Sequence, residues 1–301
     1  MQKKIYDVII IGGSYAGLSA ALALGRSLRQ TLVIDSGEPC NRQTPRSHNF
    51  LTQDGTPPGE ISSIAKSQVM AYKSVEFVEG FAIKADANKN GFLVQTESGG
   101  TFEGKRMILA TGIKDSMPKI PGFSECWGIS AIHCPYCHGY EYRGKKVGLM
   151  ASPEKAFHLT SLLLNLQNEI TILQTDPSSF SKEQLKTLHQ HNVKILNQKI
   201  TKIEHKDGHV QQVFLDSGEQ LALSAIYAGL PFEQSSDIPK ELGCELNEQG
   251  FLKTDMFQKT SIPGVFACGD NCIPMRSVAQ AVASGNLAGA MANMELSQES
   301  F

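Results

Sequence analysis

Residues 5–35 read IYDVIII, GGSYAG, LSAALALGRSLRQ and TLVID in succession, and this stretch decides the fold. The first seven residues form an almost continuous apolar run, which is typical of a buried β-strand. A glycine-rich loop follows, then a run of small and apolar residues that predicts a helix, and then a second strand that ends at Asp35. The succession of strand, glycine loop, helix and strand predicts a βαβ unit, and with it an α/β fold.

This βαβ unit has the features of a dinucleotide-binding site. Gly12 and Gly17 allow a tight turn and close packing, the N–H groups of the following helix face a pyrophosphate, and the Asp35 carboxylate can bind ribose hydroxyls. Ser14 stands at the second glycine position of the G-x-G-x-x-G pattern, where it narrows the approach to the phosphate without forbidding it. The strand, the helix and the acid together make the pattern stronger than a glycine motif alone.

A second and weaker βαβ pattern lies in the middle of the chain. Residues 145–150 predict a strand, residues 154–167 a helix and residues 169–174 another strand. Gly148 is the only glycine before this helix, and Gln174 stands where a ribose-binding acid is expected. No arginine occurs between positions 143 and 276, although a cationic group is normally needed to select the 2′-phosphate of NADPH. Lysines remain in this part of the chain, so the pattern predicts a nucleotide site that is degenerate and leaves NADPH binding open.

Composition and charge exclude several classes of protein. The chain has 301 residues, 41% hydrophobic and 19% charged, which fits a globular protein of two domains. The formal net charge is −2 and no block of Lys and Arg offers itself to nucleic acid or to a membrane surface. No uninterrupted apolar stretch reaches the roughly 18 residues of a membrane span, and Asp7 and Gly12 interrupt the N-terminal apolar run, so no secretory signal is expected. We therefore expect a cytoplasmic protein, in which the 7 cysteines are not structural disulfides.

Four segments carry a resemblance to a known family. IIGGSYAGLSAA at 10–21, ATG at 110–112, CPYC at 134–137 and GVFACGD at 264–270 occur in this order. In that order they resemble the low-molecular-weight thioredoxin reductases over essentially the whole chain. The segment CPYCHGYE is similar to a branch that includes dithiol oxidases of the gliotoxin and holomycin type. The usual reductases have an aspartate after the second cysteine, where this chain has His138.

The resemblance implies an α/β fold with two Rossmann-like domains, each of the three-layer ββα type. A discontinuous FAD-binding domain would comprise residues 1–115 and 248–301, and an inserted NAD(P)H-domain-like region, residues 116–247, would carry the cysteines. Members of the family are usually homodimers, so the resemblance also implies a homodimer.

The resemblance further implies FAD as cofactor and assigns its contacts. Gly12, Ser14 and Gly17 would cradle the pyrophosphate, and Asp35 would hold the adenosine ribose. Thr111 would lie against the cofactor and Asp270 would meet its ribityl and phosphate region. For Gln43 and Asn49 two interpretations stay open, a contact near the flavin edge or polar loop residues with satisfied hydrogen bonds.

The segment HCPYCH, residues 133–138, allows four interpretations. It matches the C-x-x-C-H motif of c-type haem attachment, but that chemistry requires export. Two sulfurs and two histidines suit zinc, with Cys268 and Cys272 as a second pair, although Asp270 between them has the better flavin role. Two buried structural cysteines are the third interpretation. The fourth is a redox dithiol, which we favour because a flavin site is argued independently; we therefore expect no metal.

Two residues between the cysteines allow their sulfurs to close a small ring, and a thiolate is the attacking species in exchange. By resemblance, Cys137 faces the flavin and Cys134 is the exposed sulfur that exchanges with an outside partner. His138 can give or take the proton of each step, because imidazole titrates near ~6.5. The expected partner is a thioredoxin-like protein or a small-molecule dithiol or disulfide.

The source of the electrons stays open between three hypotheses. The first is a disulfide reductase that takes electrons from NADPH, NADH or another donor such as ferredoxin. The second is a dithiol oxidase, in which electrons run from a small-molecule dithiol through Cys134 and Cys137 to FAD and then to O₂. The third is a flavin-binding redox sensor without turnover.

Overall fold

The computed structural model describes residues 4–166 and 168–301, and within them the chain forms two compact units. Unit 1 comprises the chain up to Arg42, Phe50–Lys114 and Glu233–Phe301, whereas unit 2 comprises Gln43–Asn49 and Asp115–Phe232. The chain thus returns to unit 1 at Glu233, whereas the sequence places the return of the domain at 248, and the expected domain bounds stay a prediction. The expected α/β class is confirmed by parallel sheets with helices in both units.

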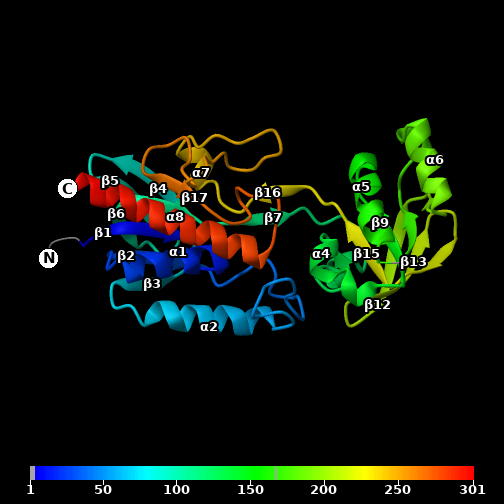
Figure 1. Cartoon of the computed structure of the whole chain (residues 1–301), viewed down its shortest axis with the longest axis horizontal. Helices are drawn as coiled ribbons and strands as arrows, with labels where there is room; N and C mark the ends of the chain where they lie inside the picture. Colours follow the sequence, from blue (N-terminus) through cyan, green and yellow to red (C-terminus); the bar gives the residue numbers. More distant parts are fainter. Residues whose placement is uncertain (1–3, 167) are drawn as a thin grey trace. The chain divides into compact units, whose positions relative to one another are not determined.

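Unit 1 is built on a seven-stranded sheet, shown with its helices in Figure 1. The strand order is β3 (Val75–Glu79), β2 (Thr31–Asp35), β1 (Ile5–Ile11), β6 (Thr101–Leu109), β5 (Gly91–Thr96), β4 (Ala82–Asn88), and β17 (Val265–Ala267) also pairs with β6. Strands β3, β2, β1, β6 and β17 are parallel, and β5 and β4 are antiparallel to their neighbours. The parallel strands end at one edge of the sheet, which is where ligands bind in open α/β folds.

Alternate residues of the central strand β1 face two different layers. Val8 and Ile10 belong to the core that includes helices α1 (Tyr15–Arg26) and α8 (Val278–Glu299). Ile9 and Ile11 belong to the second core, which includes residues of β4 and β5. A strand that is buried on both faces reads as a continuous apolar run, which explains the pattern IYDVIII.

Helices α1 and α8 lie side by side, as Figure 1 shows, because small residues form their contact. A Cβ atom on Gly285 would come within 2.0 Å of the Ala16 carbonyl oxygen, and one on Gly289 within 2.6 Å of that of Ala20. The first turn of α1 is therefore fixed against the C-terminal helix. Helix α2 (Pro58–Met70) and the short helix α7 (Ile238–Glu241) complete the helices of unit 1 in the described part of the chain.

Unit 2 repeats the three-layer plan on a smaller scale. Its central sheet is parallel, in the order β11 (Lys194–Ile195), β10 (Glu169–Ile172), β9 (Lys146–Met150), β15 (Ala225–Ala228), β8 (Ala131–Ile132). One face packs against α5 (Pro153–Leu164) and α6 (Lys182–Gln190), and the other against an antiparallel sheet of β12 (Ile200–Lys206), β13 (His209–Leu215) and β14 (Gln220–Ala222). The short elements are α3 (Phe123–Cys126), α4 (Pro135–His138), η1 (Tyr140–Tyr142) and η2 (Pro177–Ser179).

The two chain connections between the units run as paired strands. These are β7 (Ile113–Asp115) and β16 (Phe232–Gln234), which form a two-stranded sheet. Within unit 1 the Ser235 N–H donates to the Gly112 carbonyl, and within unit 2 the Ser116 N–H donates to that of Pro231 at 2.8 Å.

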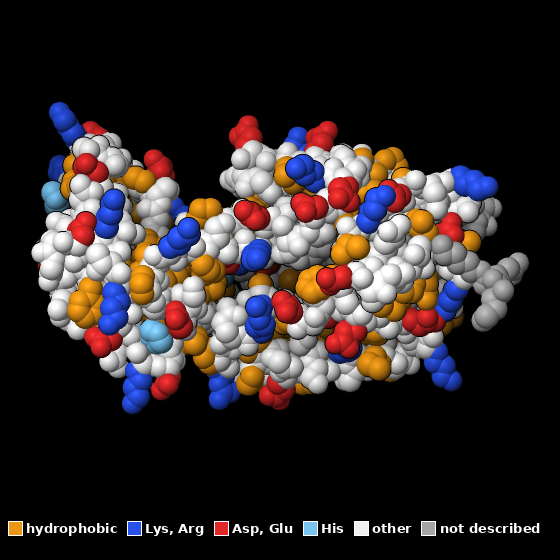
Figure 2. Space-filling model, turned by 180° about the vertical axis from the view of Figure 1, so that it is seen from behind, with side chains coloured by type: hydrophobic (Ala, Val, Ile, Leu, Met, Phe, Trp, Pro, Cys, Tyr) orange, Lys and Arg blue, Asp and Glu red, His pale blue; other side chains and the backbone are white. Residues whose placement is uncertain are grey.

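The surface and the helices add two observations. On the face shown in Figure 2, basic and acidic side chains alternate among the described residues, in line with the small net charge of −2. Among residues 4–166 and 168–301, no helix combines the length and the apolar character needed to cross a membrane.

Candidate active site

The cysteine motif lies at the end of strand β8 in unit 2. The strand ends at Ile132, Cys134 keeps extended backbone with φ −127° and ψ 115°, and Pro135 opens the single turn of α4. Proline suits this first helical position because its missing N–H would have no helical partner there. The Cys137 and His138 N–H groups both donate to the Cys134 carbonyl at 3.3 Å, so the turn closes directly on the first cysteine.

This turn brings the two cysteine Sγ atoms to 2.9 Å. A disulfide bond measures ~2.05 Å, so the sulfurs need only a small movement to bond. Both side chains are half-buried, and Tyr136 between them is 65% exposed. The pair can therefore both close a disulfide and be reached by a partner from outside.

His138 follows the second cysteine and lies in a charged cluster with two residues that the sequence analysis did not single out. The His48 ring meets the His138 ring edge-on with centroids 6.1 Å apart, and His48 Nε2 lies 3.6 Å from Glu141 Oε1. Burial lowers the pKa of His138 below its ordinary value; Glu141 opposes this shift and His48 adds to it. An imidazole with a lowered pKa is neutral near pH 7 and can accept a proton from a thiol.

The spacing of Glu141, three residues after His138, is a signal that could have been found in the sequence. His48 could not have been found in that way, because only the tertiary fold brings residue 48 next to residue 138.

A buried tyrosine lies beneath the cysteine turn. Tyr227 of β15 is the register partner of Ile132 in β8 and is fully buried, and its hydroxyl has no hydrogen-bond partner within the described residues. Burial raises the pKa of this phenol, and Tyr142, Glu141 and Cys134 raise it further. Tyr227 is therefore a neutral phenol.

The glycine loop of unit 1 fits a pyrophosphate. Gly12 has φ 101°, and a Cβ atom there would come within 2.3 Å of the Ala110 carbonyl oxygen. A Cβ atom on Gly17 would come within 1.8 Å of the Gly12 carbonyl oxygen, so neither position accepts a side chain. The Gly13 N–H donates to Asp35 Oδ1 at 2.8 Å, which places the acid of β2 at the loop.

Ser14 occupies the position before α1 in extended backbone, and its side chain makes no capping hydrogen bond. A helix N-terminus leaves its first N–H groups without intrahelical partners, and such groups bind anionic oxygen. Ser14 therefore leaves these donors of α1 to a ligand.

Thr111 and Asp270 lie in unit 1 with a residue that the sequence analysis missed. Asn271 is fully buried, and its Nδ2 donates to the Leu109 carbonyl at 2.8 Å and to Thr111 Oγ1 at 3.3 Å. Its Oδ1 is buried without a hydrogen-bond partner among the described residues, which is the kind of orphaned acceptor that a cofactor donor satisfies. Arg276 Nε lies 3.6 Å from Asp270 Oδ2, so the acid also has a cationic neighbour. Nothing in the sequence distinguishes Asn271 from other polar residues after a strand.

The expected site residues divide between the units. Unit 1 holds six of them, namely Gly12, Ser14, Gly17, Asp35, Thr111 and Asp270. Unit 2 holds Cys134, Cys137 and His138, and also Gln43 and Asn49, because Gln43–Asn49 packs with unit 2. Gln43 lies against Gly128, where a Cβ atom would come within 2.8 Å of its Nε2, and Asn49 has φ 59°.

The turn between β9 and α5 in unit 2 differs in sequence from the glycine loop between β1 and α1 in unit 1. The segment from Met150 to Pro153 contains no glycine, and α5 begins directly at Pro153. Gln174 has φ 54°, and its Oε1 accepts a hydrogen bond from the Ile200 N–H at 3.1 Å. The amide is therefore engaged with the antiparallel sheet of unit 2.

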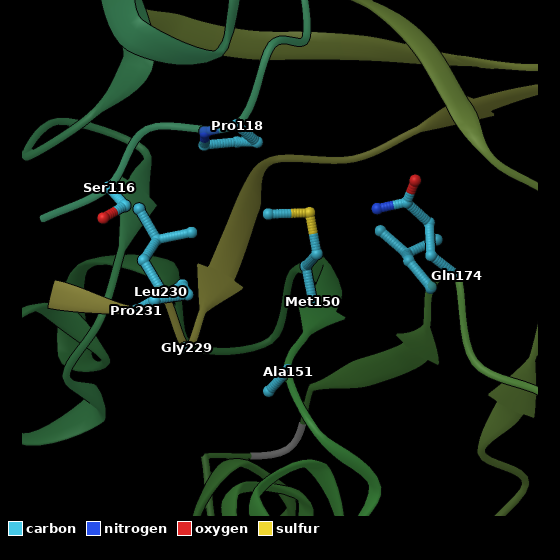
Figure 3. Close-up of a pocket in the computed structure, with 9 residues that line it drawn as sticks. Ser116, Pro118, Met150, Ala151, Gln174, Gly229, Leu230 and Pro231 are labelled. Atoms are coloured by element: carbon cyan, nitrogen blue, oxygen red, sulfur yellow. The ribbon is translucent and has the colours of Figure 1, made fainter. Parts of the chain in front are cut away.

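Met150, Ala151 and Gln174 border a cavity of about 410 Å³ in unit 2. Figure 3 shows Met150 in the middle of the lining, with Gln174 on one side and Leu230 on the other. None of the described residues that line it carries a charge. The pyrophosphate and 2′-phosphate of NADPH are normally bound by backbone donors and a cation, and a cation close to this lining is Lys155, whose Nζ would lie 3.0 Å from a Cβ atom on Gly229.

Comparison with known proteins gives the family of the chain. Residues 6–286 match the family described as pyridine nucleotide-disulphide oxidoreductase. The chain belongs to this family. Membership implies FAD as cofactor, and this oxidoreductase is a thioredoxin reductase-like enzyme that acts on disulfides and thiols.

Curated relatives and solved structures are similar over almost the whole length of the oxidoreductase. Thioredoxin reductase tcpT of Claviceps purpurea is 33% identical, with 97% of this chain and 95% of the relative covered. Thioredoxin reductase aclD of Aspergillus oryzae is 31% identical, with 96% and 95% covered. The oxidoreductase from Agrobacterium tumefaciens has a TM-score of 0.91 at 38% identity, covering 98% of this chain and 99% of that one. The structure of HlmI has a TM-score of 0.90 at 28% identity, covering 98% and 93%.

The remaining cysteine pair of the oxidoreductase lies in the core of unit 1. Cys268 is fully buried, and burial raises its pKa well above the ordinary value; for Cys272, burial and Asp270 raise the pKa to about 12. Both therefore stay protonated and unreactive. Within the described part of the chain, no three His, Cys, Asp or Glu side chains are grouped so that they could hold a metal ion.

Proposed function

We propose that the oxidoreductase passes electron pairs between FAD and the Cys134–Cys137 pair, and from this pair to or from an outside thiol or disulfide. The observation that carries the proposal is the 2.9 Å distance between the two Sγ atoms on a partly exposed turn. The partner that we propose is a thioredoxin-like protein or a small-molecule dithiol or disulfide. The names of the relatives tcpT and aclD, both thioredoxin reductases, support a partner of this class.

Unit 1 is the proposed FAD-binding domain. Gly12, Ser14 and Gly17 would hold the pyrophosphate, Asp35 the adenosine ribose, and the Thr111 and Asp270 region the remainder of the cofactor, with Asn271 as a further contact. Bound FAD supplies an acceptor and donor of electron pairs. The orphaned Asn271 Oδ1 and the excluded Cβ positions of the glycine loop support this assignment.

The cysteines carry out the exchange with the partner. In the reducing direction the Cys134 thiolate attacks a sulfur of the partner disulfide, so that a bond from Cys134 to the partner forms and the partner's own S–S bond breaks. Cys137 then attacks Cys134 Sγ, closes the Cys134–Cys137 disulfide and releases the second partner thiolate. Two electrons have moved to the partner, and His138 supplies the proton that a leaving thiolate needs. The reverse sequence oxidises a dithiol.

We propose further that NADPH is not an efficient donor, so that oxidation of a dithiol with O₂ as the final acceptor is the second candidate function. The loop without glycine, the uncharged cavity and the engaged Gln174 amide support this view. The proposed mechanism therefore assigns no step to a nicotinamide.

An anaerobic titration of the yellow holoenzyme tests both proposals. NADPH, NADH, dithiothreitol and reduced thioredoxin are added separately, and the flavin absorbance is followed. We expect a dithiol to bleach the flavin and NADPH to leave it unchanged, with peroxide formed in a 1:1 ratio when air is admitted. Rapid bleaching by NADPH would contradict the loss of the nucleotide site, and a colourless protein that takes up no flavin would contradict the whole scheme.

The variant Cys137→Ser gives the largest expected effect on this reaction. It removes the sulfur that closes the disulfide, so we expect FAD to be retained and bleaching by dithiothreitol to fall by at least ~10³-fold. Cys244→Ser is the matched control, because Cys244 is a buried thiol of unit 1 whose neighbour is Thr260. Normal turnover by Cys137→Ser would show that the roles of the cysteines are assigned wrongly.

A further inference from the structure

Segment Gln43–Asn49 brings a second histidine to the cysteine turn. The segment packs with unit 2, although the chain on both sides of it belongs to unit 1. His48 meets His138 edge-on at 6.1 Å between ring centroids and lies 3.6 Å from Glu141. The side chains of His48 and Glu141 are 21% and 38% exposed, so both are near His138 and are also accessible to solvent.

The chemistry of the cysteine pair requires the movement of two protons. When Cys134 and Cys137 are oxidised, one S–S bond forms, two S–H bonds break, the electron pair passes to FAD and two protons leave the sulfurs. One imidazole holds one proton at a time, so His138 must release the first proton before it can take the second. A second proton carrier next to His138 removes this obstacle.

We propose that His48, held by Glu141, is this second carrier, a positioning residue that takes each proton from His138 and releases it to water. The inference rests on the proposed function of the cysteine pair and deepens it. When His48 gains a proton, its positive charge disfavours a proton on His138, and the neighbouring imidazole is thereby reset for the next transfer. The Glu141 carboxylate lies within reach of both charges and stabilises each of them in turn.

The charged and titratable groups around this relay come from several elements. Glu141 of η1 and His48 of the segment Gln43–Asn49 act on His138 of α4. Burial raises the pKa values of Tyr142 of η1 and Tyr227 of β15, and Glu141 raises both further, which keeps both phenols neutral. The two phenols therefore add no charge to the relay, which consists of the two histidines and Glu141.

Two variants that should shift the pKa of His138 in opposite directions test the proposal. His48→Gln removes the imidazole that lowers the pKa of His138 and should raise this pKa, whereas Glu141→Gln removes a negative charge and should lower it, each by roughly 0.5 units or more. His158→Gln is the control, because His158 is an exposed histidine on α5 of the same unit. The pKa of His138 is measured by NMR on the holoenzyme with labelled histidine, and the signal is assigned by its loss in His138→Gln.

The kinetic test follows bleaching of the flavin by dithiothreitol under anaerobic conditions from pH 5 to 9. The acid limb of the profile should move to higher pH in His48→Gln and to lower pH in Glu141→Gln, with a rate loss of ~3- to 10-fold at pH 7 in the former. Profiles and His138 titrations that coincide with those of His158→Gln in both variants would overturn the proposal and leave His48 as a structural contact of the segment. If His48→Gln loses its flavin, Glu141→Gln decides the question, because it leaves the segment intact.

Failure of the proposed function gives a different result. If dithiothreitol does not bleach the wild-type holoenzyme at any pH, the exchange between cysteines and flavin is wrong. The NMR titration still shows in that case whether His48 and Glu141 set the protonation of His138.

Discussion

Two strand–loop–helix turns of the same topology differ in this molecule, one in each unit. The turn after β1 contains Gly12 with φ 101° and folds directly onto the backbone of Ala110, whereas the turn after β9 runs from Met150 to Pro153 without glycine. After the first helix, Asp35 at the end of β2 accepts a hydrogen bond from the N–H of Gly13 in the glycine loop. After the second helix, Gln174 beyond β10 accepts one from the N–H of Ile200, which belongs to another sheet. Both units nevertheless keep a central set of parallel strands, with α1 and α8 packed on it in unit 1 and α5 and α6 in unit 2.

The comparison teaches that the fold and the ligand site depend on different residues. Burial of strands and helices is enough to keep the βαβ architecture, and it tolerates Met-Ala-Ser-Pro in the turn. Close approach of an anionic ligand needs positions without a side chain, and only the first turn retains them. The reactive groups that we propose for unit 2 lie elsewhere, at the turn after β8.

The largest expected effect comes from adding a methyl group to the first turn. In Gly12→Ala the new Cβ atom meets the Ala110 carbonyl, which cannot move away as a flexible side chain would, and φ 101° is unfavourable for alanine. We expect a loss of at least ~3 kcal/mol in the free energy of unfolding, or a protein without FAD. Urea unfolding and the ratio of flavin to protein measure the two outcomes.

The control for this prediction is the opposite change in the second turn. Ala151→Gly should lower the free energy of unfolding by no more than ~1 kcal/mol and leave the flavin content unchanged. Removing a methyl group creates no clash, and only the added backbone freedom of glycine opposes folding. Equal losses in the two variants would mean that the two turns do not differ in the way that their geometry indicates.

Sequence alone was sufficient for the architecture but not for the surroundings of the site. The apolar run of residues 5–11 and the glycine loop predicted β1, α1 and the α/β class, because local periodicity and turn chemistry decide them. His48, Asn271 and Tyr227 were missed, because their importance comes from contacts between segments distant in the chain. For Gln43 and Asn49 the sequence left open a contact near the flavin edge or a role as polar loop residues, and no pattern in it indicates that their segment packs with unit 2.

A smaller difference in FAD affinity is expected between variants of Asp35, which ends β2, and of Gln174, which follows β10. Asp35→Asn keeps an acceptor for the Gly13 N–H but loses the charge that favours ribose hydroxyls, so we expect the Kd for FAD to rise ~10- to 100-fold. Gln174→Asn tolerates φ 54° but falls short of the Ile200 N–H, so we expect a loss of ~1 kcal/mol in stability and an unchanged Kd. Flavin release measured by fluorescence gives both constants, and a weaker affinity in Gln174→Asn would contradict the separation of the two sites.

The smallest effect concerns the pH dependence of stability at the cysteine turn, a property that the glycine loop does not share. Burial lowers the pKa of His138 in the folded protein, whereas an unfolded histidine titrates near ~6.5. The unfolded chain therefore binds more protons than the folded one as the pH falls through ~6.5, and the free energy of unfolding decreases in that range. Above about pH 7.5 both states are neutral at this residue, and the contribution is constant.

His138→Gln should therefore flatten the stability profile between roughly pH 5 and 7, while His158→Gln should keep the wild-type slope. The carboxyls with lowered pKa lose their contributions only at more acidic pH, so the histidine range is separate from theirs; among the described residues they are Asp7, Glu76, Asp176, Glu183 and Glu295. Urea unfolding at intervals of half a pH unit measures the slopes. If His138→Gln and His158→Gln gave the same slope, the turn would carry no proton-dependent cost, and the lowered pKa of His138 would lose its structural explanation.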